Sequence, residues 1–229
     1  MSRRRRNSFA YVLVMSAGYV DGYGLFAFGT FLSFMSGNTT QTGYDLGRGR
    51  FGAAVPGAAA IAGFVIGATV GSTLSRDTGA RARRLVLIVV AALESMVMLL
   101  ANTGAISSLA LVAMLSAAMG ILNRAVTHIG GQSVSLTFVT GTLSQLAAHV
   151  SSAIAGLPLR DATDARDTHA RRSIELAGVW CCFLAGAVLG GLAAPRLAAW
   201  TLAPSVVVLI GLAILPISRA PSPSTDDGT

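Results

Sequence analysis

Long apolar stretches separated by short polar segments dominate this chain and restrict what it can fold into. About 20 consecutive apolar residues are needed to cross a lipid bilayer. Only 12% of the residues are charged, whereas a soluble domain carries about 25%. The sequence therefore predicts an all-α polytopic membrane protein without a separate soluble domain. The apolar stretches are the run that begins at Phe9–Val20, and then Gly52–Ser75, Leu85–Ala101, Ala105–Leu122, Ile174–Ala194 and Ala198–Ile217.

Every basic residue is an arginine, and the formal net charge is +7. The arginines stand at the ends of apolar stretches, where the positive-inside rule places them, so the charge does not indicate a nucleic-acid partner. Arg3–Arg6 precede the first apolar run, which continues into Asp21 without a clean signal-peptide cleavage site. We therefore expect an uncleaved first helix with a cytoplasmic N-terminus. A twin-arginine export signal is the alternative.

A polar-centred phrase occurs twice in the otherwise apolar sequence. Phe34–Gln41 reads FMSGNTTQ, and Phe138–Gln145 reads FVTGTLSQ. Flanking segments match in the same order, which predicts an internal duplication within a single membrane domain (1–229). We expect repeat 1 at 8–104, repeat 2 at 105–217 and a disordered tail at 218–229. The flanking matches are Gly18–Asp21 with Gly120–Asn123, and Phe64–Gly71 with Phe183–Gly190.

The arginines favour one topology for the two broken segments, Leu25–Gly43 and Val134–Gly156. If neither segment crosses the membrane fully, fewer arginines lie outside, and the positive-inside rule is obeyed better. We therefore expect about six full spans plus two broken or re-entrant segments. Three spans in each half would make the two pseudo-symmetric repeats inverted, which is common among transporters. With six full spans, the arginines outside would be Arg48, Arg50 and Arg196. If both broken segments crossed, giving eight spans, they would be Arg76, Arg81, Arg83, Arg84, Arg124 and Arg196.

Both copies of the polar phrase carry a capping-box pattern, in which the cap residue is followed three residues later by glutamine. This predicts that a helix begins just after Asn38 and another just after Thr142. Helix N-termini inside the membrane expose unpaired N–H groups and a positive dipole end, which suit an anionic or polar group. The alternative is that these small residues mediate close helix packing. The candidate substrate-binding residues are Asp21, Ser36, Gly37, Asn38, Thr39, Gln41, Asn123, Arg124, Thr140, Gly141, Thr142 and Gln145.

Few charged residues lie inside the apolar sequence. Buried carboxylates are expensive in lipid and usually face a polar cavity, so Asp21 and Glu94 are candidates for proton coupling. By pseudo-symmetry Asp21 could pair with Arg124, which would offset part of the desolvation cost. The alternatives are a helix-end position at the interface for Asp21 and a snorkelling side chain for Arg124. For Glu94 the alternative is a protonated side chain packed against another helix. We expect structural roles for Glu175 and for the lone histidines, and the adjacent Cys181 and Cys182 indicate neither a disulfide framework nor a metal site.

Glycine ridges occur at equivalent places in the two halves. Gly63, Gly67 and Gly71 recur as Cys182, Gly186 and Gly190, spaced by one helical turn so that another backbone can pack closely. We expect these helices to pack against the broken segments or against each other. The same ridges could join two copies of the chain in a homodimer.

The chain resembles the YoaK-type family of bacterial integral membrane proteins, a domain of unknown function, over about residues 8–217. The resemblance implies a multi-pass protein of the bacterial inner (plasma) membrane and no established substrate. Ser36 stands where the family usually has threonine, and Leu122 where it usually has glutamine. The resemblance lies in Gly18–Gly22, Phe34–Thr39, Met119–Ala125 and Thr137–Leu143.

The leading interpretation is a small secondary transporter or permease for a small polar or anionic solute, with its site between the two broken segments. The lipid bilayer and the solute are then the expected partners, and no cofactor or metal is expected. A membrane structural or assembly subunit is the alternative. The sequence around Asp21 and Ser36 lacks the remaining residues of lipid-transferase and intramembrane-protease signatures, so we expect no enzyme activity.

Overall fold

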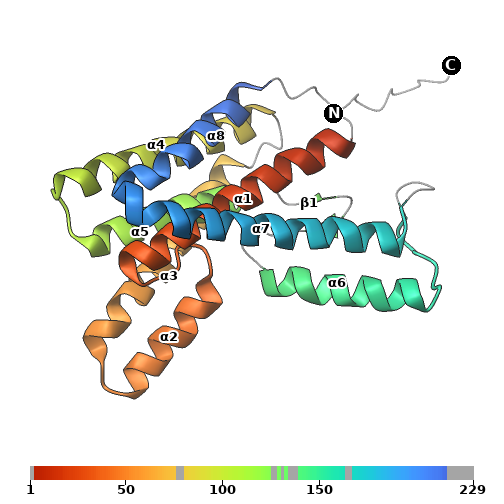
Figure 1. The fold of residues 1–229 in the computed structure, drawn as a ribbon, viewed down its shortest axis with the longest axis horizontal. Coiled ribbons are helices and arrows are strands. Elements are labelled where there is room, and N and C mark those ends of the chain that lie inside the picture. The colour runs from red at the N-terminus through yellow and green to blue at the C-terminus, as the bar shows by residue number, and fades with distance from the viewer. Residues whose placement is uncertain are drawn as a thin grey trace.

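The computed structural model describes residues 3–75, 80–124, 128–129, 132–133, 139–162 and 167–215, with the backbone alone at 3–6, 128–129 and 132–133. This part of the chain is helical apart from a short antiparallel ladder, in which β1 (His128–Ile129) pairs with β2 (Gln132–Ser133). The predicted tail at 218–229 lies outside the described residues. The helices are α1 (Arg3–Phe28), α2 (Met35–Gly47), α3 (Phe51–Leu74), α4 (Ala80–Thr103), α5 (Ser108–Leu122), α6 (Val139–Ile154), α7 (His169–Leu197), the 3₁₀-helix η1 (Ala198–Leu202) and α8 (Ala203–Ile214) (Figure 1).

Four stretches of the described residues are long and apolar enough to cross a membrane: Asn7–Phe28, Phe51–Leu74, Ala80–Thr103 and His169–Ile214. The prediction of an all-α polytopic membrane protein is confirmed at this level, although four candidate spans are fewer than the six expected. Two physical features account for the difference. Helix α5 has 15 residues, about 22 Å of helix, and the last stretch contains both α7 and α8.

The chain reverses direction within that last stretch. Ala198 at the start of η1 has a φ of +48°, a backbone conformation that residues with a Cβ rarely adopt. Figure 1 shows α7 and α8 running in opposite directions on either side of this residue. Along the same long direction α1, α4 and α7 run one way, while α3, α5 and α8 run the other.

Two pairs of closely packed parallel helices form the centre of the protein, α1 with α7 and α3 with α5. Glycines allow the backbones to touch. A Cβ added at Gly186 would overlap the carbonyl of Met15, and one added at Gly190 would overlap the carbonyl of Tyr19. In the second pair, a Cβ at Gly67 would overlap the carbonyl of Ala117. Close approach of this kind increases the dispersion contacts that hold membrane helices together, because lipid provides no hydrophobic drive between them.

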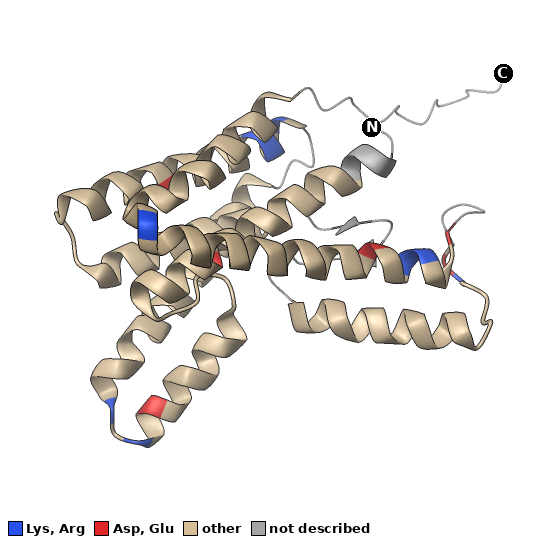
Figure 2. Ribbon diagram, viewed as in Figure 1, with Lys and Arg blue, Asp and Glu red and all other residues tan. Residues whose placement is uncertain are grey.

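Helix α4 packs against α5, η1 and α8 beside these pairs. Charged residues are sparse on the spanning helices, as the ribbon colours of Figure 2 show. One of the few acidic ones, Glu94, lies on α4 with no exposed surface. The buried apolar residues of all these helices form one continuous core. The core therefore encloses a carboxyl group in the middle of a spanning helix.

The two polar-centred segments form separate helical arms. Helix α2 packs on α3, and α6 packs on α7. In the first arm, the side chain of Thr42 on α2 lies against Gly57 on α3. The two glycine helices thus pack on the broken segments, as expected, but their glycine ridges face α5 and α1. The physical reason is that α1 and α5 also present small residues, such as Gly18 and Gly120, at which the backbones can meet.

Candidate functional site

Asp21 holds the loop between α1 and α2. Its side chain is 4% exposed, and Oδ1 accepts hydrogen bonds from the backbone N–H groups of Leu32 (2.6 Å) and Ser33 (2.8 Å). Oδ2 accepts from the Ser33 hydroxyl at 2.9 Å. A carboxylate that accepts several hydrogen bonds inside an apolar region offsets much of the cost of its own burial. The geometry therefore gives Asp21 a positioning role for this loop.

Asn38 fastens the same loop from the other side. Its Nδ2 donates to the carbonyl of Phe31 at 2.7 Å, and its Oδ1 accepts from the N–H of Phe31 at 3.2 Å. The amide thus pairs with one backbone unit much as a neighbouring strand would. Asn38 is buried, so these bonds satisfy polar groups that water does not reach.

The predicted helix starts at Asn38 and Thr142 are wrong. Helix α2 begins at Met35 with Phe34 as its cap residue and without a side-chain cap, and α6 already includes Thr142. Gln41 does not reach back to Asn38 but donates to the Oδ2 of Asp45 at 2.9 Å. The glutamine is thereby committed to a contact one turn further along α2, which removes the capping box.

The structure also does not bring the two polar-centred segments together. Helices α2 and α6 pack on different partners and lie apart in Figure 1, so the expected site between them is not formed. Among the described residues Asp21 and Arg124 make no ion pair, because Asp21 is bonded to the loop and the Arg124 side chain lies beside Gly71. Thr142 is buried and Asn123 and Gly141 are half-buried, whereas Ser36, Thr39, Arg124, Thr140 and Gln145 are exposed.

Glu94 is surrounded differently from Asp21. Neither of its carboxylate oxygens has a hydrogen-bond partner among the described residues, although the Ser205 hydroxyl of α8 lies close to it. Four further buried hydroxyls lack a partner among the described residues. One is that of Thr42 on α2, and the other three are those of Ser116, Thr201 and Ser205. Because these three residues come from α5, η1 and α8, which all pack on α4, the helix contact around Glu94 contains polar groups that the protein leaves unsatisfied.

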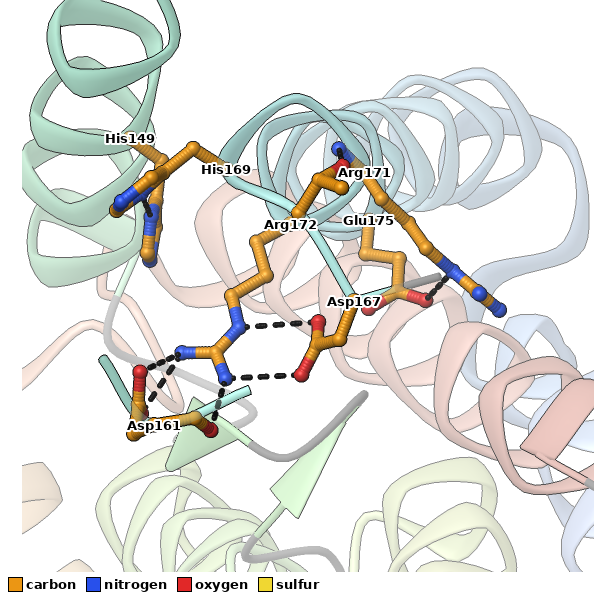
Figure 3. A network of polar contacts seen from close by, with 8 residues as sticks. His149, Asp161, Asp167, His169, Arg171, Arg172 and Glu175 are labelled. Atoms are coloured by element: carbon orange, nitrogen blue, oxygen red, sulfur yellow. Dashed lines mark hydrogen bonds and ion pairs between the residues drawn. The ribbon is translucent and has the colours of Figure 1, made fainter. Parts of the chain in front are cut away.

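A second polar cluster lies at the start of α7 (Figure 3). The guanidinium of Arg172 is 3% exposed and binds Asp167 through Nε (3.2 Å) and Nη2 (2.9 Å). Its Nη1 also reaches the carboxylate of Asp161 at 2.9 Å. Bidentate pairs of this kind fix geometry, so the cluster ties the chain before α7 to that helix.

The histidines beside this cluster are paired with each other, although the sequence shows His149 as a lone residue. The Nδ1 atoms of His149 on α6 and His169 on α7 are 2.7 Å apart, a hydrogen bond that needs one proton between the two nitrogens. Burial lowers the pKa of His149, and the neighbouring His169 and Arg172 lower it further, while Asp161 and Asp167 oppose this. His149 therefore resists protonation in the folded protein.

Acidification should consequently weaken the protein. An unfolded histidine takes up its proton near pH 6.5, and the lowered pKa of His149 means that this residue takes up its proton in the folded protein only at lower pH. The contribution of His149 to folding stability is then fully present above about pH 6.5. It is lost as the pH falls from there through the lower pKa of His149 in the folded protein. We expect the thermal midpoint of the detergent-solubilised protein to fall between pH 7.5 and 5.5. The His149→Gln variant should show a flatter profile, and Ser144→Ala on the same helix should keep the wild-type profile. An unchanged profile in His149→Gln would contradict the assignment.

Several of these residues escaped the sequence reasoning. Ser116, Thr201 and Ser205 are isolated hydroxyls in apolar stretches, a weak signal that could have drawn attention to them. Asp167 and Arg172 lie in a polar connection, where charged residues are ordinarily solvated. Nothing in the local sequence indicates that both become buried.

Comparison with known proteins gives the family. A family model described as a protein of unknown function (DUF1275) matches residues 9–215. The chain belongs to this family. The chain is also similar to the UPF0700 transmembrane protein RA0705 of Rhizobium meliloti (strain 1021), with 32% identity over 147 residues, which is 62% of this chain and 62% of the relative. No solved structure matches. The resemblance seen in the sequence is confirmed, and the multi-pass membrane character of the chain agrees with the description of its relative.

Proposed function

We propose that this chain is a small secondary transporter for a polar or anionic solute, driven by a monovalent cation that binds at Glu94. One observation carries the proposal. The Glu94 side chain is 0% exposed within a candidate membrane span, and both of its oxygens lack hydrogen-bond partners among the described residues. Burying an ionisable residue inside a spanning helix costs free energy, and such residues are typical of ion pathways.

Of the two candidate coupling residues, the contacts favour Glu94 over Asp21. The three hydrogen bonds that Asp21 accepts occupy both of its oxygens. Releasing and rebinding a cation there would require those bonds to break in every cycle. Glu94 has no such bonds to lose, so it can exchange a cation at lower cost.

The helix packing supports two inverted repeats. In the α1–α7 pair, Gly18 lies against the carbonyl of Phe183, and in the α5–α3 pair the equivalent Gly120 lies against that of Phe64. Helix α1 and its counterpart α5 run in opposite directions in Figure 1. The equivalent helices α4 and α8 pack on each other, so Glu94 lies where the two halves meet. Transporters built from inverted repeats bind their ions at that contact.

The start of α2 supports a polar or anionic solute. Its cap residue Phe34 provides no side-chain bond, so N–H groups of the first turn around Ser36 and Gly37 remain for another acceptor. We propose that this end serves the solute and that the chain acts as a carrier rather than as an enzyme.

The alternative of a structural or assembly subunit is favoured by a different observation. Asp21 and Asn38, the two most prominent polar residues of the first repeat, direct their hydrogen bonds to the loop between α1 and α2. A subunit with no solute of its own would need such fastenings and would not need Glu94 to be ionisable.

Solute uptake by the reconstituted protein distinguishes a transporter from a structural or assembly subunit. Liposomes containing the full chain would be given an inward proton or sodium gradient and a panel of labelled amino acids, monocarboxylates and dicarboxylates. We expect gradient-driven uptake of at least one class by the wild type, and uptake at the level of protein-free liposomes for Glu94→Gln. Ser95→Ala is the control, because Ser95 is adjacent but bonds to its own helix. Equal uptake by Glu94→Gln, or no uptake by the wild type, would overturn the proposal.

A further inference from the structure

Four polar residues in the contact between α4, α5, η1 and α8 form what we term the oxygen layer: Glu94, Ser116, Thr201 and Ser205. All four are buried, the first three with 0% exposure. Both oxygens of the Glu94 carboxylate and all three hydroxyls lack hydrogen-bond partners among the described residues. Buried polar atoms are nearly always satisfied, so a group of them in one region calls for an explanation.

Glu94 and Ser116 lie at a similar level of the α4–α5 hairpin, and Thr201 and Ser205 belong to the two elements η1 and α8, which pack on α4. Helices α4 and α5 form a hairpin whose loop follows Thr103 and precedes Ser108. Glu94 and Ser116 are therefore each about 12–14 Å from that loop along their helices. Thr201 and Ser205 are one turn apart at the junction of η1 and α8, and the Ser205 hydroxyl lies close to the Glu94 carboxylate.

Several other hydroxyls of the helices behave differently. Thr39, Thr69 and Ser95, for example, donate to the carbonyl four residues earlier at 2.7–2.9 Å. This bond is available to a serine or threonine inside a helix. Ser116 lies inside α5 and forgoes it although no water reaches its side chain. The hydroxyls of the oxygen layer are thus left free to serve something else.

We propose that the oxygen layer binds one dehydrated sodium ion, which is the coupling ion of the transporter; this inference rests on the proposed function. All of its ligands are oxygens, the donors that hard cations select. Glu94 is the only acidic residue in α4, α5, η1 and α8. One carboxylate balances one positive charge, so a monovalent ion leaves the site neutral, whereas a divalent ion would leave a charge buried in lipid.

A sodium ion accounts for the layer better than a proton does. A proton on Glu94 would engage the carboxyl and a single neighbouring acceptor, whereas a cation can take a lone pair from several oxygens at once. A central cation draws the lone pairs of all these oxygens toward one point, where they do not hydrogen-bond to each other. Apart from the contact between the Ser205 hydroxyl and the Glu94 carboxylate, the four described side chains make no hydrogen bonds to each other, which fits this second arrangement.

Thermal unfolding of the purified full chain in detergent tests the inference. Sodium chloride would be titrated against choline chloride at pH 8 and constant ionic strength. We expect a saturable rise in the thermal midpoint of the wild type and none in Glu94→Gln. In Thr201→Val and Ser205→Ala the sodium concentration at half-effect should rise about tenfold, as loss of roughly 1.4 kcal/mol from one ligand implies. Ser95→Ala should match the wild type. If Glu94→Gln does not fold, the two hydroxyl variants carry the test.

The outcomes separate this inference from the proposed function. A thermal midpoint that ignores sodium in the wild type would overturn the sodium site. If solute uptake in liposomes were then driven by a proton gradient and lost in Glu94→Gln, the transporter would stand with a proton as its ion. If sodium raised the midpoint but no panel solute were taken up, the site would stand and the transport proposal would fail.

Discussion

Replacing Gly190 with alanine should strongly destabilise the protein, whereas the same replacement at the adjacent Gly191 should leave it intact. A Cβ at Gly190 would overlap the backbone carbonyl of Tyr19 on α1, while one at Gly191 meets nothing within 4 Å. Backbone cannot move aside as a side chain can, so α1 and α7 must separate. Overpacking of this kind costs about 1–3 kcal/mol, occasionally more, and we expect a value near the upper end.

The measurement is the thermal midpoint of each variant in the same detergent, with monodispersity by size exclusion. About 3 kcal/mol corresponds to a fall of roughly 6–12 °C for a chain of this size. Gly191→Ala should be neutral or gain up to about 1 kcal/mol, because alanine is the better helix former. Equal midpoints for the two variants would mean that α1 and α7 do not touch at this level.

Replacing Asp21 with alanine should be the second severe change. Two backbone N–H groups and the Ser33 hydroxyl would lose their acceptor in a buried place. Each unsatisfied buried group costs about 1–3 kcal/mol, and we expect a total of about 3–5 kcal/mol. Asp21→Asn should lie between the wild type and alanine, because its amide oxygen can still accept from the loop.

Two further variants show whether this effect comes from the loop. Ser33→Ala removes a single bond and should cost about 1 kcal/mol. Arg124→Gln should change stability by less than about 0.5 kcal/mol, because Arg124 is exposed and does not pair with Asp21. A loss in Arg124→Gln as large as that in Asp21→Ala would instead support the ion pair expected from pseudo-symmetry. All four can be compared by thermal midpoint in one detergent.

The hydrogen bonds of Asp21 and Asn38 give these two polar residues a structural role. Asp21 and Asn38 combine polarity with burial, as ligand-binding residues do, yet their hydrogen bonds go to the loop at 29–34. Glu94 lies in an apolar stretch of the sequence, and its carboxylate accepts none of these loop hydrogen bonds. A buried polar residue therefore indicates a ligand most clearly when its polar atoms have no hydrogen-bond partners within the protein.

The membrane class, the places of the apolar helices and the residues that let them pack were predictable from the sequence. Hydropathy and helical spacing are local properties, so Gly67, Gly186 and Gly190 could be recognised as packing positions before their partners were known. The helix start at Asn38 was wrong because a capping box competes with contacts from outside the helix, and here Asn38 bonds to Phe31 and Gln41 to Asp45. Only the tertiary structure decided that Glu94 is buried beside Ser205 where α5, η1 and α8 pack on α4, and that Arg172 is buried between Asp161 and Asp167. The physical reason is that such contacts join residues far apart in the chain, and whether a polar group is satisfied depends on which helices meet.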